Sequence, residues 1–285
     1  MQKKIRRIES LISTNFHRNE TDIVSEMVKE WNLNRIINLN PFSLNGTSYN
    51  LWLEFTQAVT HGKPYVSVEI ELDENEYMEQ SGYETEFGDV AIIVEYYLES
   101  TLLSSRISLL QTKKETRPDQ AAISLNQLYL MQFWPSVKFG GHNFKFNNVA
   151  PEDFSFYHFI LCQSKPPFCS SSICSSPLVY AKLGLTKSTL VNQLKSWNLQ
   201  RKTSGRKTHS PSLTLNKLLP GAVDSLNIWK KHSWDMIPKP FSRFLQEAAY
   251  LFIGTQNEEI RRLTELRVPN ILLLRVEASR ERYRG

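Results

Sequence analysis

Hydrophobic side chains recur at helical spacing in two stretches near the start of the chain. The first predicts a helix over residues 21–38, with one apolar face made by Ile23, Met27, Val28, Trp31 and Ile36. Asn40-Pro41 ends this pattern, because the residue before a proline is disfavoured in the helical region. The second stretch predicts a helix over residues 49–60, with Glu54 beside an apolar side made by Leu51, Trp52, Phe55 and Val59.

Strand patterns follow these helices. Residues 65–72 alternate apolar and polar side chains, which is typical of a strand with one buried face. Residues 89–97 are apolar almost throughout, which favours a central strand covered on both faces. Residues 106–113 and 156–163 predict two more strands, and residues 120–133 predict a helix between them. The predicted order is helix, strand, strand, strand, helix, strand.

The last third of the chain changes in character. Residues 185–197 predict a short helix, and residues 199–212 are basic, polar and typical of a loop. Helices are predicted over residues 240–253 and 255–267, and a buried strand over residues 270–277.

These elements predict an α/β (α+β) protein with a mixed central sheet. The sequence suggests three parts: a helical N-terminal segment (1–47), an αβββαβ core (48–163) and a basic C-terminal extension (164–285) packed on the core. The start of the chain lacks the apolar stretch of a signal peptide, and no apolar run is long enough to span a bilayer. We therefore expect a cytoplasmic protein without a membrane partner.

Charge is segregated along the chain, although the formal net charge is only +5. Residues 64–105 contain eleven acids and no lysine or arginine, whereas residues 154–223 contain nine bases and no acid. A long acid-free stretch suits a phosphate-rich partner, because Lys and Arg contacts to phosphates supply most of the non-specific affinity for nucleic acid.

Three polar side chains lie at the ends of two predicted strands. If residues 89–97 and 106–113 form a hairpin with opposite residue numbers summing to about 203, Asp89 falls beside Lys113 or Lys114. Gln111 and Lys113 share a face, because alternate residues of a strand point the same way. A carboxylate and an amide oxygen are hard ligands suited to Mg²⁺ or Mn²⁺. A lysine beside the metal can orient a water and stabilise charge on a phosphate.

This layout resembles the PD-(D/E)xK nuclease superfamily, which has the restriction-endonuclease-like fold. The resemblance covers about residues 48–163 and depends on Asp89 opening the second strand and Gln111-Thr-Lys113 ending the third. The Gln-x-Lys pattern is similar to the branch found in bacterial anti-phage defence nucleases and restriction enzymes. Two departures stand out: Gly88 replaces the usual proline, and Gln111 replaces the usual Glu or Asp, which removes one negative charge from the site.

The resemblance implies a metal-dependent DNA endonuclease, acting in anti-phage defence or restriction, with Mg²⁺ (or Mn²⁺) as cofactor. It implies that Asp89 and Gln111 hold the metal and that Lys113 handles the attacking water. It also implies a further carboxylate on the first core helix, where Glu54 is the candidate; Glu86 in the loop before Asp89 is the less favoured one.

A cluster of bases in the C-terminal extension is the candidate surface for DNA. Five of them surround Trp197, which is suited to stacking on a base or lying against a backbone. They are Lys195, Arg201, Lys202, Arg206 and Lys207.

Other interpretations stay open at this point. RNA remains an alternative substrate, and a solvated loop remains an alternative account of the basic cluster. Because Gln111 lowers the negative charge of the site, a catalytically degenerate nuclease fold that binds DNA or a companion defence subunit is the main alternative function. A weaker alternative is a homo-oligomer in which the acidic and basic blocks of two copies dock together.

Overall fold

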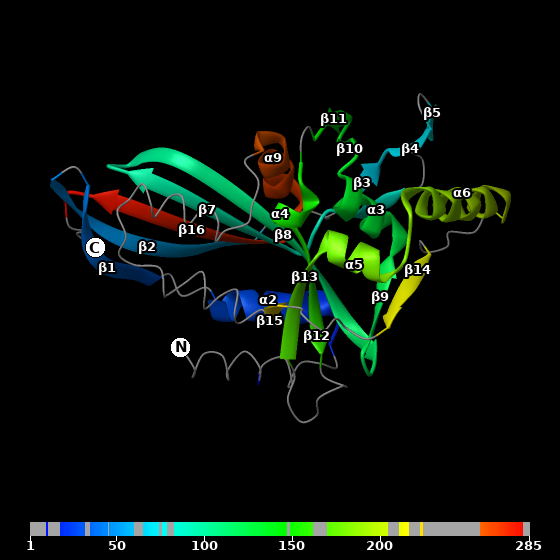
Figure 1. Cartoon of the computed structure of the whole chain (residues 1–285), viewed down its shortest axis with the longest axis horizontal. Coiled ribbons are helices and arrows are strands. Elements are labelled where there is room, and N and C mark those ends of the chain that lie inside the picture. The colour runs from blue at the N-terminus through cyan, green and yellow to red at the C-terminus, as the bar shows by residue number, and fades with distance from the viewer. Residues whose placement is uncertain are drawn as a thin grey trace.

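The protein has a mixed α/β architecture with helices on both sides of a mixed central sheet (Figure 1). The computed structural model describes residue 10 and residues 18–31, 35–44, 46–59, 65–73, 76–78, 83–146, 149–161, 170–204, 211–216, 223–224 and 257–281. Within these residues, no helix is long and apolar enough to cross a membrane.

One large twisted sheet organises the molecule. Its path follows the order β1 (Arg35–Leu44), β2 (Thr47–Val59), β16 (Asn270–Ser279), β7 (Val90–Leu98), β8 (Thr101–Arg117), β12 (Ser155–Leu161), β13 (Ser170–Ser175) and β15 (Val223–Asp224). Neighbours pair antiparallel except β16 with β7 and β12 with β8, which are parallel. Strand β9 (Gln120–Ser124) pairs with β8 and with β14 (Ser212–Asn216).

The remaining elements are short. A four-stranded sheet has the order β11 (His142–Phe144), β10 (Val137–Phe139), β3 (Tyr65–Val68), β6 (Glu84–Glu86), and β4 (Ile70–Asp73) pairs with β5 (Glu76–Met78). The helices are α2 (Glu20–Trp31), α3 (Leu125–Phe133), α4 (Pro151–Phe154), α5 (Ser176–Lys182), α6 (Lys187–Ser204) and α9 (Glu258–Arg267).

The two faces of the large sheet are buried differently. On one face, Ala91 and Ile93 of β7 join the main hydrophobic core together with side chains of α3 and α9. On the other face, Val90 joins a smaller cluster with Val24 of α2. Because side chains alternate along a strand, odd-numbered residues of β7 and β8 point toward α3 and α9, and even-numbered residues toward α2. Figure 1 shows α2 and α9 on opposite sides of the sheet.

Several predicted elements are confirmed. The strands over 89–97, 106–113, 156–163 and 270–277 are observed as β7, β8, β12 and β16, with shifted ends. The strand over 65–72 is split into β3 and β4. The helix over 255–267 is observed as α9, whereas the stretch 120–133 is helical only from Leu125 onward, as α3, and its first five residues form β9. The predicted helix 240–253 lies outside the described residues.

The predicted helix over residues 49–60 is wrong, because this stretch forms strand β2. Leu51, Leu53 and Phe55 recur at every second position, with Glu54 and Thr56 among the residues between and beyond them, and this period of two suits a strand paired on both edges. The helix predicted over 21–38 ends at Trp31, and β1 begins at Arg35. The N-terminal segment predicted as helical therefore contains a strand, and the expected first core helix is absent from residues 49–59.

Strand β16 of the C-terminal extension lies in the centre of the sheet. It pairs with β2 over Asn270–Ser279 and with β7 over Asn270–Ala278. The sheet that carries the predicted core thus includes a strand from beyond residue 164, while the division of the chain at 47/48 and 163/164 stays a prediction.

The turn between β7 and β8 fixes the register of the predicted hairpin. Glu99 and Ser100 both have positive φ, 48° and 63°, as in the two-residue turns that match the twist of paired strands. Val90 lies opposite Leu110, so paired residue numbers sum to 200 over most of the hairpin instead of about 203. Continuing this register by one residue places Asp89 opposite Gln111, so its predicted place beside Lys113 or Lys114 is wrong by about three residues.

Candidate functional site

The site forms at the part of β8 that extends past the first residue of its antiparallel neighbour β7. Strand β7 begins at Val90, whereas β8 extends to Arg117, so the last third of β8 has no β7 backbone beside it. Two backbone N–H groups on this edge donate to carboxylates instead. Thr112 donates to Asp89 Oδ2 over 2.7 Å, and Lys114 donates to Glu20 Oε1 over 2.9 Å. The sheet thereby gathers two carboxylates along one strand edge, because a buried backbone donor needs an acceptor.

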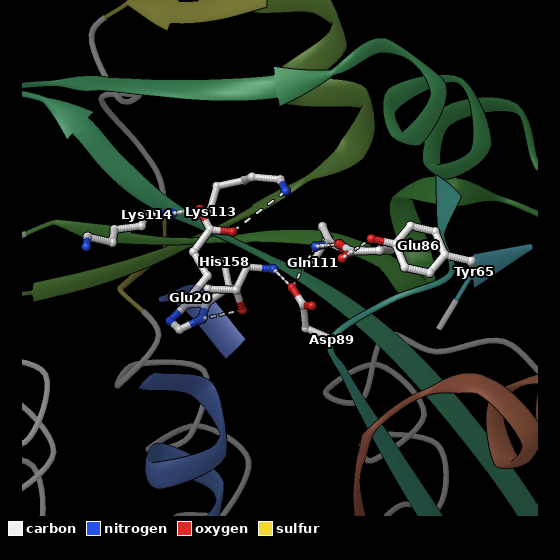
Figure 2. A network of polar contacts seen from close by, with 9 residues as sticks. Glu20, Tyr65, Glu86, Asp89, Gln111, Lys113, Lys114 and His158 are labelled. Carbon is white, nitrogen blue, oxygen red and sulfur yellow. Dashed lines mark hydrogen bonds and ion pairs between the residues drawn. The ribbon is translucent and has the colours of Figure 1, made fainter. Parts of the chain in front are cut away.

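Gln111 bridges two carboxylates at the centre of the site (Figure 2). Its Nε2 donates to Asp89 Oδ2 over 2.6 Å and to Glu86 Oε2 over 3.2 Å. The Gln111 side chain is 1% exposed, and its Oε1 has no hydrogen-bond partner. Tyr65 donates its hydroxyl to the second oxygen of Glu86 over 3.4 Å. The predicted proximity of Asp89 and Gln111 is therefore observed, and Glu86 lies beside both.

Burial changes the ionisation of Asp89. Its side chain is 6% exposed, and desolvation by burial, with the negative charge of Glu86 adding to it, raises the pKa of Asp89 to about 7. The positive charge of Lys113 and the hydrogen bond from Thr112 oppose this rise in pKa. Asp89 is thus a carboxyl group that takes up and loses a proton near neutral pH, which suits an acid/base or metal-binding role.

Lys113 and Lys114 are neighbours in sequence but point to opposite faces of β8. The Nζ of Lys113 lies 3.9 Å from Glu20 Oε2, and its side chain is 13% exposed. The Nζ of Lys114 donates to the Arg18 carbonyl over 3.1 Å. Only Lys113 shares the face of Gln111, and Figure 2 shows the two lysine side chains diverging. The Lys113 ammonium therefore acts on two carboxylates of the site, since it lies near Glu20 and its positive charge opposes the rise in the pKa of Asp89.

His158 lies behind the site, next to Thr112 on β8. The Thr112 hydroxyl is 3.4 Å from His158 Nδ1, and burial lowers the pKa of His158 to about 4. His158 is therefore neutral near pH 7 and adds no positive charge behind Asp89.

Glu54 lies far from the site and cannot take the role predicted for it. It pairs across the sheet with Arg275 of β16, which in turn lies level with Glu95 of β7. Glu95 is six positions along the strand from Asp89, so Glu54 is roughly 20 Å away at the usual rise per residue. The helix expected to carry Glu54 is a strand, and that change of element moves its carboxylate away from Gln111.

The basic residues predicted to bind nucleic acid lie on or just beyond α6. Lys195, Arg201 and Lys202 are on this helix, whereas Arg206 and Lys207 lie outside the described residues. Trp197 is not free for stacking on both faces: its ring centroid is 6.0 Å from that of Tyr83, edge to face, and the Arg201 guanidinium lies 5.8 Å from the ring centroid.

The helix α6 is connected to the site through β6. The Tyr83 hydroxyl donates to the Leu194 carbonyl over 3.3 Å, and Glu86 follows Tyr83 by three residues, roughly 10 Å of extended chain. Lys187 at the start of α6 forms a 2.6 Å ion pair with Glu71. The acidic and acid-free blocks of the sequence therefore meet in the folded protein.

Two site residues had no functional assignment from the sequence. Glu20 lies one residue before the helix predicted over residues 21–38, and no local pattern indicates its contact with Lys114, which is 94 residues away. Tyr65 begins a predicted strand, and its hydroxyl bond to Glu86 depends on the pairing of β3 with β6. Both contacts are long-range, so the only available signal was that each residue lies at or next to the start of a predicted element.

The donor set fits a hard divalent cation. Asp89 and Glu86 supply carboxylate oxygens, and the unpartnered buried Oε1 of Gln111 supplies an amide oxygen. In the part of the chain that the structure describes, no group of three or more His, Cys, Asp or Glu side chains is arranged to hold a metal. A metal here would therefore use two carboxylates, one amide and several waters, as Mg²⁺ commonly does.

Comparisons with known proteins give no further guide. No family model, no curated protein and no solved structure matches the chain. A functional proposal therefore depends on the chemistry of the site.

Proposed function

We propose that the protein is a metal-dependent nuclease that hydrolyses phosphodiester bonds in DNA. The observation that supports this most is the buried 2.6 Å contact between Gln111 and Asp89, with Lys113 on the same face two residues further along β8. The resemblance to Q-x-K nucleases suggests a role as an effector of bacterial anti-phage defence or restriction.

Asp89, Glu86 and Gln111 would hold Mg²⁺ or Mn²⁺. A bound ion of this kind lowers the pKa of a water ligand and offsets charge on the phosphate. The Gln111 amide now directs its nitrogen at the two carboxylates, and rotation about its last side-chain bond would exchange the nitrogen with the free oxygen. Asp89 would lose its proton when it binds a cation, since its pKa is about 7 in the absence of one.

Lys113 would orient the attacking water or donate to a phosphate oxygen. Glu20 holds this lysine at 3.9 Å, and the same carboxylate is fixed by the Lys114 backbone N–H. A lysine held in place before the substrate binds loses less side-chain entropy in the reaction, which favours catalysis.

The bases of α6 would bind the DNA backbone. Lys195, Arg201 and Lys202 lie on this helix, and Arg206 and Lys207 follow it in sequence. Phosphate contacts of this type position the strand without reading its sequence.

The test is cleavage of plasmid and linear DNA with Mg²⁺ or Mn²⁺, with RNA as a parallel substrate. We expect the wild-type protein to cleave DNA, and the Asp89→Ala and Lys113→Ala variants to lose cleavage while keeping DNA binding. Equal cleavage by wild type and both variants would rule out the assigned site.

A second function is favoured by one specific feature. Because the Gln111 amide nitrogen already donates to one oxygen of each carboxylate, both acids have a hydrogen-bond partner without a cation, as expected for a degenerate nuclease fold that binds DNA or a partner nuclease. This alternative predicts salt-sensitive DNA binding without cleavage, weakened when Lys195, Arg201 and Lys202 are replaced by Gln.

A further inference from the structure

Tyr65 places an exposed aromatic ring at the rim of the site. It is the first residue of β3, lies directly opposite Glu86 on β6, and is 50% exposed. In Figure 2 the ring lies beyond Glu86, on the side away from Lys113 and Glu20. An exposed tyrosine is common on surfaces, but this one donates its hydroxyl to a carboxylate that also contacts Gln111.

The surroundings of Tyr65 favour an uncharged ligand group over a phosphate. Glu86 accepts a hydrogen bond from its hydroxyl, so the hydroxyl is occupied while the exposed ring is left for a ligand. A phenol ring carries no positive charge to bind a phosphate, whereas a nucleobase is neutral and stacks on an aromatic ring. The other aromatic candidate, Trp197, already contacts Tyr83 and Arg201.

We infer that Tyr65 is a stacking platform for an unpaired base next to the phosphodiester at Asp89, so that the substrate is single-stranded DNA or an unpaired end or flap. This inference rests on the proposed nuclease function. In an intact duplex both faces of each base are covered by neighbouring bases, so a base can stack on Tyr65 only where it is already unpaired or has left the helix. The hydroxyl bond to Glu86 fixes the orientation of the ring.

The inference is tested by fluorescence of a single-stranded DNA of about a dozen nucleotides that carries 2-aminopurine, with Ca²⁺ in place of Mg²⁺. Stacking on tyrosine quenches this base. We expect quenching with the wild-type protein and with Tyr65→Phe, which keeps the ring. Tyr65→Ala should lose the quenching and bind roughly tenfold more weakly, in line with the loss of one stacked base.

Leu103→Ala is the matched control, because Leu103 is 44% exposed on the far end of β8 and should leave binding unchanged. A matched duplex should bind Tyr65→Ala and wild type equally. Equal quenching and affinity of wild type and Tyr65→Ala for the single strand would overturn the inference, even if DNA is cleaved. Conversely, quenching that depends on Tyr65 without any cleavage under Mg²⁺ would support the platform and reject the nuclease.

Discussion

The two ends of strand β7 bury carboxylates on the same face of the sheet but give them different partners. Glu95, in the half toward the turn, pairs with the Arg261 guanidinium and accepts the Tyr97 hydroxyl over 2.8 Å. Asp89, just before the strand, accepts its hydrogen bonds from the Gln111 amide and the Thr112 backbone. A guanidinium neutralises a buried carboxylate, whereas an amide satisfies a lone pair and leaves the charge. Burial of an acid thus indicates a reactive site only when its partners do not neutralise it.

The largest expected difference between the two ends is in DNA cleavage. Replacing Asp89 by Asn removes a proposed metal ligand, so we expect cleavage to fall by about a thousandfold or more. Glu95→Gln, the matched replacement, should leave the cleavage rate within about twofold, because Glu95 lies roughly 20 Å along the strand from Asp89. Single-turnover rates on linear DNA measure both. An equal loss of cleavage rate in Asp89→Asn and Glu95→Gln would mean that the two ends of β7 do not differ in function.

The second difference is in the dependence of stability on pH. The pKa of Asp89 is about 7 in the folded protein and about 3.9 in an unfolded chain, so the folded state binds the proton more tightly. The resulting stability is fully present below about pH 4 and is lost as the pH rises to about 7. Urea denaturation should show that Asp89→Asn removes this loss of a few kcal/mol. If the free energy of unfolding of Asp89→Asn depends on pH as that of the wild-type protein does, the raised pKa of Asp89 is contradicted.

Stability at a single pH should also separate the two carboxylates. At pH 8, Glu95→Gln weakens the partly buried pair with Arg261, and we expect the free energy of unfolding to fall by about 1–2 kcal/mol. Asp89→Asn removes a desolvated charge and should hold or raise the free energy of unfolding. Urea denaturation midpoints of the two variants, measured at the same pH, check this prediction. A lower midpoint in both variants would show that the Asp89 carboxylate also stabilises the fold.

A charge added at the site should strengthen cation binding there. Gln111→Glu restores an acid between Asp89 and Glu86, so we expect Mn²⁺ to bind about tenfold more tightly. Calorimetric titration measures the affinity, with Gln127→Glu on α3 as a buried control outside the assigned donor set. Equal Mn²⁺ affinity in wild type and Gln111→Glu would place the cation elsewhere.

The smallest expected effect concerns the acid that the sequence placed in the site. Glu54→Gln should change cleavage by less than about twofold, because Glu54 lies on β2 and is roughly 20 Å from Asp89. A large loss of cleavage, with unfolding unchanged, would mean that Glu54 has a role that this geometry does not provide.

The strands that carry Asp89, Gln111 and Lys113 were more predictable than the elements that support them. The apolar run after Asp89 predicts strand β7, and the two-residue spacing of Gln111 and Lys113 predicts their shared face. The register could not be predicted, since the turn residues Glu99 and Ser100 lack the Gly or Asn that usually signals a tight hairpin turn.

The features that could not be predicted from the sequence depend on long-range contacts. The strand β16 was predicted, but its position between β2 and β7 depends on pairing with segments far away in sequence. The contact of Glu20 with the edge of β8 is of the same kind. Residues 49–59 satisfied both a helical and a strand spacing, and pairing with β1 and β16 decided in favour of the strand.

The most direct test of the proposed site compares two adjacent lysines. Lys113 shares the face of Gln111, whereas Lys114 points to the other face and contacts the Arg18 carbonyl. The measurement is the single-turnover rate of Mg²⁺-dependent DNA cleavage by wild type, Lys113→Ala and Lys114→Ala. We predict that Lys114→Ala cleaves within about threefold of wild type and that Lys113→Ala loses about a hundredfold or more. Cleavage by Lys113→Ala at the wild-type rate, or no Mg²⁺-dependent cleavage by the wild-type protein, would contradict the proposal.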